Sequence, residues 1–253
     1  MRALFLLPLL LSPLVAPAPA AAAEPVDVML VLVTDVSRSV DDTEFTLEKE
    51  GYGSAFADPR VLAAIKGGPI GQIAVAYVEF AGSYEVRTVV DWHVVRDAAS
   101  ATAFTDEIKA AQRSYWGRTS ISAGIDHAMQ MLIEGGFEAQ RRVIDVAGDG
   151  TNNSGRETTD ARDDAVKAGV TINGLAIINE HPVSYTFAHV QPPGGLTNWY
   201  AENVTGGNGS FVVEVRSFQA FGEAMTRKLL SEVAENPIVI ASEARRSSPT
   251  TAP

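Results

Sequence analysis

The sequence of 253 residues contains no cysteine. Disulfide bonds, thiolate metal sites and cysteine nucleophiles are therefore excluded. Basic residues are also scarce, since 20 Lys and Arg stand against 31 Asp and Glu and give a formal charge of −11. Proteins that bind nucleic acid present a basic surface to the phosphates, so we expect no nucleic-acid partner.

Long apolar runs are missing after the N-terminus. Residues 3–15 follow Arg2 and are apolar apart from one serine and two prolines, and three alanines precede Glu24. This pattern predicts a signal peptide over residues 1–23 that is cleaved before Glu24, and hence a periplasmic or secreted protein. The run is short and interrupted, and no later segment is longer, so we expect no membrane span.

The remaining chain predicts one domain over residues 24–234, followed by a disordered tail over residues 235–253 that is rich in Ser, Thr, Pro and Ala. Apolar runs alternate with segments of helical periodicity, which is typical of an α/β fold. We expect a doubly wound, mostly parallel six-stranded sheet with one antiparallel edge strand and helices on both faces. The predicted strands are 28–34, 73–80, 86–92 (the edge strand), 142–147, 170–178 and 210–215.

The first predicted strand ends in a group of polar side chains. Asp35, Ser37 and Ser39 alternate along the chain, so an extended backbone places all three on one side. Oxygen ligands that converge at the end of a buried strand suggest a site for a hard cation. The alternative is a turn before a capped helix, since Ser39, Asp41 and Asp42 are all good N-cap residues.

Two further oxygen-bearing residues occupy related positions in the predicted fold. Thr119 stands at the entry of a predicted helix, and Asp149 follows the fourth strand directly. If the strand order reverses between the first and fourth strands, their carboxyl ends flank a crevice, where ligands bind in open α/β sheets.

Asp35-x-Ser37-x-Ser39, then Thr119, then Asp149 resembles the metal-ion-dependent adhesion site of von Willebrand factor type A domains. The resemblance covers roughly residues 26–234. The stretches VAYVEF, RRVIDVAGDGTNNSGR and AGVTINGLAI are similar to an uncharacterised group of exported bacterial type A-like proteins.

The resemblance implies that Ser37, Ser39 and Thr119 offer hydroxyl oxygens to Mg²⁺ (or Mn²⁺). Asp35 and Asp149 then hold the ion largely through bound waters and hydrogen bonds to the serines. Such a site leaves the ion short of negative charge, so a Glu or Asp carboxylate of a partner protein completes the shell. The implied function is that of an exported, metal-ion-dependent protein-binding module, not an enzyme.

Two alternatives remain at this stage. One is a metal-dependent hydrolase or phosphatase of the bacterial envelope. Aspartyl-phosphate phosphatases need a second acid two residues after the first, where Ser37 stands here, and no GxSxG nucleophile elbow occurs. The other is a metal-free structural domain in which the motif is degenerate.

Several side chains near the motif have two interpretations. Arg38 and Arg118 either point outward or help to hold an acidic partner. Trp116 and Trp199 belong either to a rim around the metal site or to the core. Asp145, within the fourth strand, is interpreted as a buried polar group with a structural hydrogen bond.

Overall fold

The apolar strand β1 (Glu24–Asp35) lies in the interior of a six-stranded sheet of order β3-β2-β1-β4-β5-β6. The computed structural model describes residues 23–178 and 191–234. The predicted signal peptide, apart from Ala23, and the predicted tail lie outside the described residues. β1 pairs in parallel with β2 on one side and β4 on the other, so the strand order reverses at β1. The other strands are β2 (Ile73–Phe80), β3 (Val86–Val95), β4 (Phe137–Gly148), β5 (Thr171–Ile177) and β6 (Val212–Val215).

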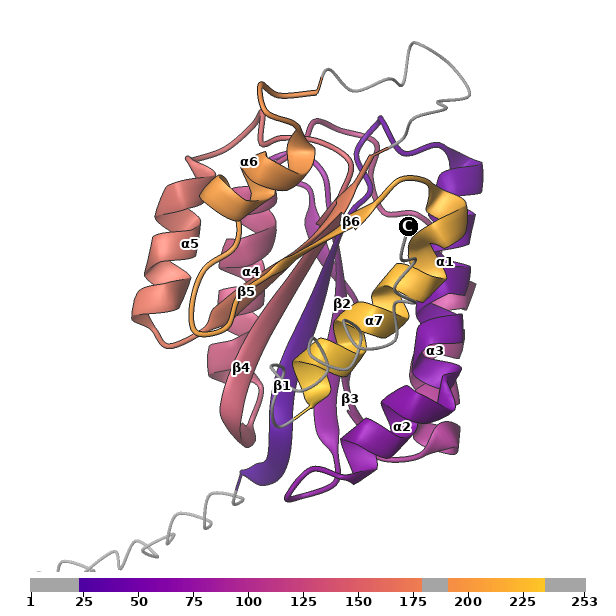
Figure 1. Cartoon of the computed structure of the whole chain (residues 1–253). Helices are drawn as coiled ribbons and strands as arrows, with labels where there is room; N and C mark the ends of the chain where they lie inside the picture. The colour runs from indigo at the N-terminus through magenta and orange to yellow at the C-terminus, as the bar shows by residue number, and fades with distance from the viewer. Residues whose placement is uncertain (1–22, 179–190, 235–253) are drawn as a thin grey trace, which may run out of the picture.

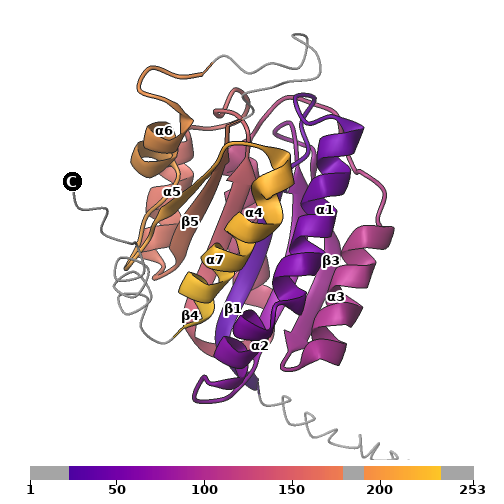
Figure 2. The same ribbon diagram turned by 45° about the vertical axis from the view of Figure 1, so that its right-hand side comes forward.

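Helices cover both faces of the sheet (Figure 1). One layer contains α1 (Asp42–Ala57), α2 (Pro59–Lys66), α3 (Ala98–Ala110) and α7 (Phe221–Val233), as the turned view in Figure 2 shows. The opposite layer contains α4 (Ile121–Glu134), α5 (Thr158–Lys167) and α6 (Leu196–Asn203). None of the helices in residues 23–178 and 191–234 is long and apolar enough to cross a membrane.

The two layers bury alternate side chains of β1. Val28, Leu30 and Leu32 pack in the core under α1 and α7, whereas Val31 and Val33 pack in the core under α4 and α5. All are fully buried, because side chains of a strand alternate between the two faces and both faces are covered. The predicted fold class, including the antiparallel edge strand β3, is thus confirmed.

The strands differ from their predicted bounds mainly at polar ends. β1 begins at Glu24 and β4 begins at Phe137, several residues before the predicted starts, because these two segments pair with each other. Their side chains are largely exposed or half-buried there, so no apolar run marks them. The last helical segment opens with a 3₁₀ turn, η1 (Phe218–Ala220), before α7 begins.

Candidate functional site

The five residues of the predicted motif come together at the carboxyl ends of β1 and β4. Ser39 Oγ donates to Asp149 Oδ1 at 2.9 Å. The hydroxyl groups of Ser37 and Ser39 are hydrogen-bonded to each other, with 3.2 Å between the two Oγ atoms. Thr119 Oγ1 donates to Ser37 Oγ at 3.0 Å. A chain of oxygen atoms therefore runs from Thr119 through both serines to Asp149.

Asp35 shapes the turn that carries the serines. It is the last residue of β1, and its Oδ1 accepts the backbone N–H of Ser37 at 2.7 Å. This local bond folds the side chain back along the chain, as Asp does in turns. Asp35, Ser37, Thr119 and Asp149 are buried, while Ser39 is half-buried and opens the group toward solvent.

The capped-helix alternative is partly correct, and Asp41, one of its candidate residues, supplies the cap. Asp41 accepts the backbone N–H groups of Thr43 and Glu44, and the Glu44 carboxylate accepts the N–H of Asp41 in return. This is a complete capping box at the start of α1. Because Asp41 satisfies the helix, the Ser39 hydroxyl bonds to Asp149 instead.

Thr119 is held in place by the loop after β4, which contains Asn153 and for which the sequence predicts no role. Asn153 Oδ1 accepts the Thr119 N–H at 3.0 Å, and the Asn153 N–H bonds to the Thr119 carbonyl at 2.9 Å. The next residue, Ser120, donates its N–H to Ala81 O at 2.6 Å. The loops after β2 and β4 therefore fix the position of the threonine hydroxyl.

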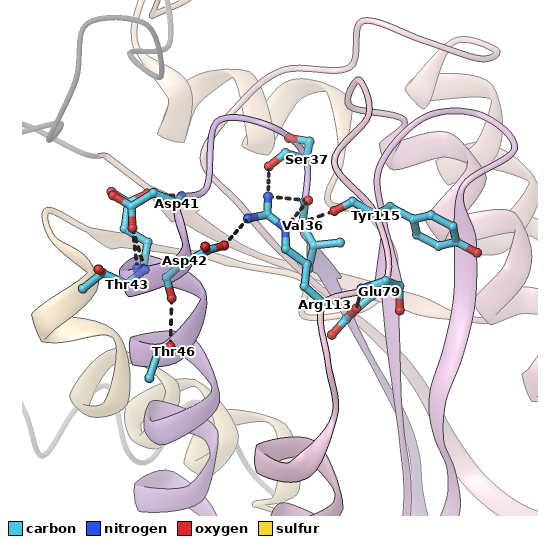
Figure 3. A network of polar contacts seen from close by, with 11 residues as sticks. Val36, Ser37, Asp41, Asp42, Thr43, Thr46, Glu79, Arg113 and Tyr115 are labelled. Atoms are coloured by element: carbon cyan, nitrogen blue, oxygen red, sulfur yellow. Dashed lines mark hydrogen bonds and ion pairs between the residues drawn. The ribbon is translucent and has the colours of Figure 1, made fainter.

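Arg113 lies beneath the serine turn and was missed by the sequence analysis (Figure 3). Its guanidinium donates to the Val36 carbonyl at 2.7 and 3.1 Å, to the Ser37 carbonyl at 2.5 Å and to the Tyr115 carbonyl at 3.0 Å. The side chain is 4% exposed. A planar fork of donors can serve several carbonyls at once, which a lysine cannot do. An isolated Arg after a helix gives no sequence signal of this role.

The structure also places the two arginines and two tryptophans for which the sequence allows two interpretations. Arg38 and Arg118 are exposed, as the outward alternative predicts, and Arg118 Nε donates to Asn153 Oδ1 at 3.4 Å. Trp116 is 58% exposed and stacks on the Arg113 guanidinium, whose central carbon is 5.3 Å from the ring centroid. Trp199 packs against the core beside Tyr200, so it belongs to the core alternative.

A buried layer of acidic character lies behind the motif. Burial raises the pKa of Glu48 well above its ordinary value, and the negative charges of Asp149 and Asp35 add to the rise. Burial likewise raises the pKa of Tyr200, with the charges of Asp35 and Asp149 contributing. Neither Glu48 oxygen nor the Tyr200 hydroxyl has a hydrogen-bond partner among the described residues.

Gly148 permits this close packing behind the motif. A Cβ at that position would lie 2.7 Å from the Tyr200 hydroxyl and 3.0 Å from Asp35 Cβ. The glycine before Asp149 therefore serves the close approach of β4, β1 and α6, and a side chain there would displace the motif aspartate.

The donor set of this site is made largely of hydroxyl groups. In residues 23–178 and 191–234, no three His, Asp or Glu side chains are grouped so that they could hold a metal ion. The motif itself has three hydroxyls and two carboxylates. Oxygen-only donors of this kind fit a hard cation such as Mg²⁺ or Mn²⁺.

The fold and the order of these residues define a domain of the von Willebrand factor type A class. The chain belongs to the family described as "Protein of unknown function (DUF1194)", whose profile matches residues 25–237. This family is von Willebrand factor type A-like. No curated protein sequence matches the chain.

Solved structures with the same fold are distant in sequence. Proximal thread matrix protein 1 of the mussel byssus, with a zinc-occupied MIDAS motif, has a TM-score of 0.57 at 16% identity over 83% of this chain and 49% of its own. A von Willebrand factor type A protein from Catenulispora acidiphila has a TM-score of 0.57 at 13% identity, over 82% of this chain and 43% of its own.

A pilus adhesin from Lactobacillus rhamnosus GG has a TM-score of 0.56 at 13% identity, over 82% of this chain and 31% of its own. The chain thus spans less than half the length of these three proteins. At this level of identity the similarity establishes the fold alone.

Proposed function

We propose that this protein is an exported binding module that holds one divalent cation, Mg²⁺ or Mn²⁺, and through it a carboxylate of a partner protein. Ser37, Ser39 and Thr119 would offer hydroxyl oxygens, and Asp35 and Asp149 would orient them and bonded waters. When bound, the ion would supply positive charge that attracts a Glu or Asp side chain of the partner.

The spacing of the hydroxyl groups is the observation that carries the proposal. Mg²⁺ binds oxygen at about 2.1 Å, so adjacent ligands of an octahedral ion lie about 3.0 Å apart. Thr119 Oγ1 and Ser37 Oγ are 3.0 Å apart, and Ser37 Oγ and Ser39 Oγ are 3.2 Å apart. The three oxygens are therefore spaced as neighbouring ligands of a small cation need to be.

One observation supports a binding role over a catalytic one, and another supports a cation in this fold. His127 bonds to Thr88 at 2.7 Å and His93 to Glu107 at 3.1 Å, so neither histidine is directed to the five motif residues. His181 and His189 lie outside the described residues. The zinc-occupied motif of the mussel protein also favours a divalent cation in this fold.

Titration of the metal-free protein with Mn²⁺, followed by calorimetry, tests the cation site. We expect one site in the wild type and no measurable binding in Asp35→Ala, because the carboxylate that orients the Ser37 turn is lost. The unfolding free energy should change by less than about 1 kcal/mol, since Asp35 ends its strand. The exposed Asp91→Ala is the matched control and should bind Mn²⁺ normally. Wild-type binding by Asp35→Ala would contradict the assignment.

Recovery of a partner from an envelope extract tests the second part of the proposal. Binding should disappear in EDTA and return with Mg²⁺, and a small carboxylate at high concentration should compete. Thr119→Ala should weaken recovery of the partner more than it weakens Mn²⁺ binding. A partner recovered equally in EDTA, and equally by Thr119→Ala, would show that this crevice is not the binding face.

A further inference from the structure

Three charged side chains meet in the interior, away from the crevice. Asp145 projects from the middle of β4, and Lys228 and Glu232 project from successive turns of α7. Lys228 Nζ is 2.7 Å from Asp145 Oδ1 and 2.5 Å from Glu232 Oε1. All three side chains are fully shielded from solvent. The sequence predicts a structural hydrogen bond for Asp145, and none of the three side chains belongs to the proposed cation site.

The surroundings of this triad exclude water and hold Glu232 in position. The Phe211 ring centroid is 5.2 Å from Lys228 Nζ. The side-chain amide of Asn173 on β5 makes two hydrogen bonds. Its Nδ2 donates to Glu232 Oε1 at 2.9 Å, and its Oδ1 accepts the Phe211 backbone N–H at 3.2 Å. Glu232 Oε1 is therefore fixed between an amide donor and the lysine nitrogen.

The contact between Lys228 and Asp145 is close but is not a well-aligned hydrogen bond. Neither oxygen of Asp145 has a hydrogen-bond partner of normal geometry among the described residues, and neither has Glu232 Oε2. A buried ion pair stabilises a fold only when its remaining lone pairs are satisfied. The nitrogen and the carboxyl group are thus in direct contact without the hydrogen bonds that would satisfy a stable ion pair.

The charges of the triad also do not balance, because two carboxyl groups face one amine. Burial, together with the negative charge of Glu232, raises the pKa of Asp145 to about 7. A fraction of Asp145 side chains therefore carries a proton near neutral pH. A protonated carboxyl group can lose hydroxide as water, whereas a carboxylate cannot.

We propose that Lys228 and Asp145 join in an intramolecular amide bond, with Glu232 as the catalytic residue that transfers the proton. Glu232 Oε1 accepts a proton from Lys228 Nζ, and the neutral amine attacks Cγ of the protonated Asp145. The new C–N bond forms, and the C–O bond to the hydroxyl group breaks. Glu232 gives this proton to the leaving hydroxyl and takes the second proton from the attacking nitrogen, so one water is released and Glu232 ends protonated. No oxidant or cofactor is consumed.

Physical conditions in this site favour that condensation. A fixed contact replaces a bimolecular encounter, which in oriented intramolecular reactions is equivalent to very high reactant concentrations. Exclusion of water disfavours the ionised form of the acid and suppresses hydrolysis of the product. A desolvated lysine is also a competent nucleophile. The bond would tie α7 covalently to the central sheet of a chain that has no cysteine.

The intact mass of the full-length wild-type protein, measured after denaturation, tests the proposal directly. We expect a mass lower by one water than that of the same processed chain, and a branched peptide after proteolysis that joins the segments containing Asp145 and Lys228. An unmodified mass, with both residues recovered in separate linear peptides, would overturn the proposal. This outcome does not depend on the cation site.

Three variants then assign the roles. Lys228→Arg keeps the positive charge without the amine nucleophile and should have the unmodified mass. Asp145→Asn should lose ammonia in place of water if it reacts. Glu232→Gln should retain the fold and lose the cross-link, or form it at least tenfold more slowly during incubation. If Glu232→Gln forms the cross-link at the wild-type rate, Glu232 takes no part in the reaction. A cross-link in Lys228→Arg would disprove the pairing of Lys228 with Asp145.

Discussion

Asp145 lies within β4 and Asp149 is the first residue after it, only four positions later, yet the surroundings of the two side chains differ. Asp145 sits between α7 and the centre of the sheet, where its side chain is 0% exposed and 2.7 Å from an ammonium group. Asp149 follows the end of β4 and accepts a hydrogen bond from the Ser39 hydroxyl at 2.9 Å. One acid faces a cation in the dry interior, and the other faces hydroxyl groups near solvent.

The difference shows how position along a strand decides the chemistry of the same residue type. In the middle of a doubly covered sheet, a carboxyl group must be neutralised by another side chain or keep its proton. At the carboxyl end of the strand, loops supply hydroxyl and amide groups, and an external cation can reach the group. The interior acid is thus part of the packed core, and the terminal acid belongs to the proposed cation site.

The largest effect is expected from Lys228→Met, which leaves two buried carboxyl groups without the lysine nitrogen that they contact and also prevents the proposed amide bond. Removing one partner of a buried ion pair typically costs about 3–5 kcal/mol of unfolding free energy. The exposed Lys66→Met should change it by less than about 0.5 kcal/mol. Urea denaturation measures both. Mn²⁺ binding by the folded fraction of Lys228→Met should remain, and its loss would mean that the two regions are not separate.

A smaller effect is expected from Arg113→Lys, which keeps the charge under the serine turn but removes the fork of donors. We expect Mn²⁺ affinity to fall about tenfold, equivalent to about 1.4 kcal/mol, because the carbonyls of Val36 and Ser37 lose shared donors. Calorimetry measures the affinity, and Arg118→Lys on the exposed rim is the control. An affinity equal to that of the wild type would show that the turn holds its shape without Arg113.

Amide hydrogen exchange in the metal-free protein tests independently whether Arg113 holds the shape of the serine turn. Residues 36–40 should exchange faster in Arg113→Lys than in the wild type, because the turn opens more often. Unchanged exchange together with weaker Mn²⁺ binding would assign the effect to charge placement and not to the shape of the turn.

The smallest effect concerns Glu48, which lies behind the crevice. Its pKa is raised in the folded state, so its contribution to stability is full below the ordinary Glu pKa and is lost as the pH rises through the folded value. Glu48→Gln cannot lose a proton. We therefore expect the variant to gain about 1 kcal/mol relative to the wild type between pH 5 and pH 8, in EDTA. Parallel curves of unfolding free energy against pH would contradict this.

The sequence predicted the fold because its signals were local. The unbroken apolar run before Asp35 marks a strand that is buried on both faces, and Asp41 with Glu44 marks the start of α1. Strand ends with polar side chains, such as the pairing of Glu24 with Phe137, were not found because no apolar pattern accompanies them. The export signal and the tail remain predictions.

The sequence by itself determined which oxygen-bearing residues fill the motif in order, namely Asp35, Ser37, Ser39, Thr119 and Asp149. Only the tertiary structure decided what surrounds them. Arg113 reaches the serine turn from the end of α3, and Lys228 reaches Asp145 from a helix 83 positions later in the chain. Such contacts depend on how helices dock on the sheet, and the spacing of residues along a chain carries no record of that docking.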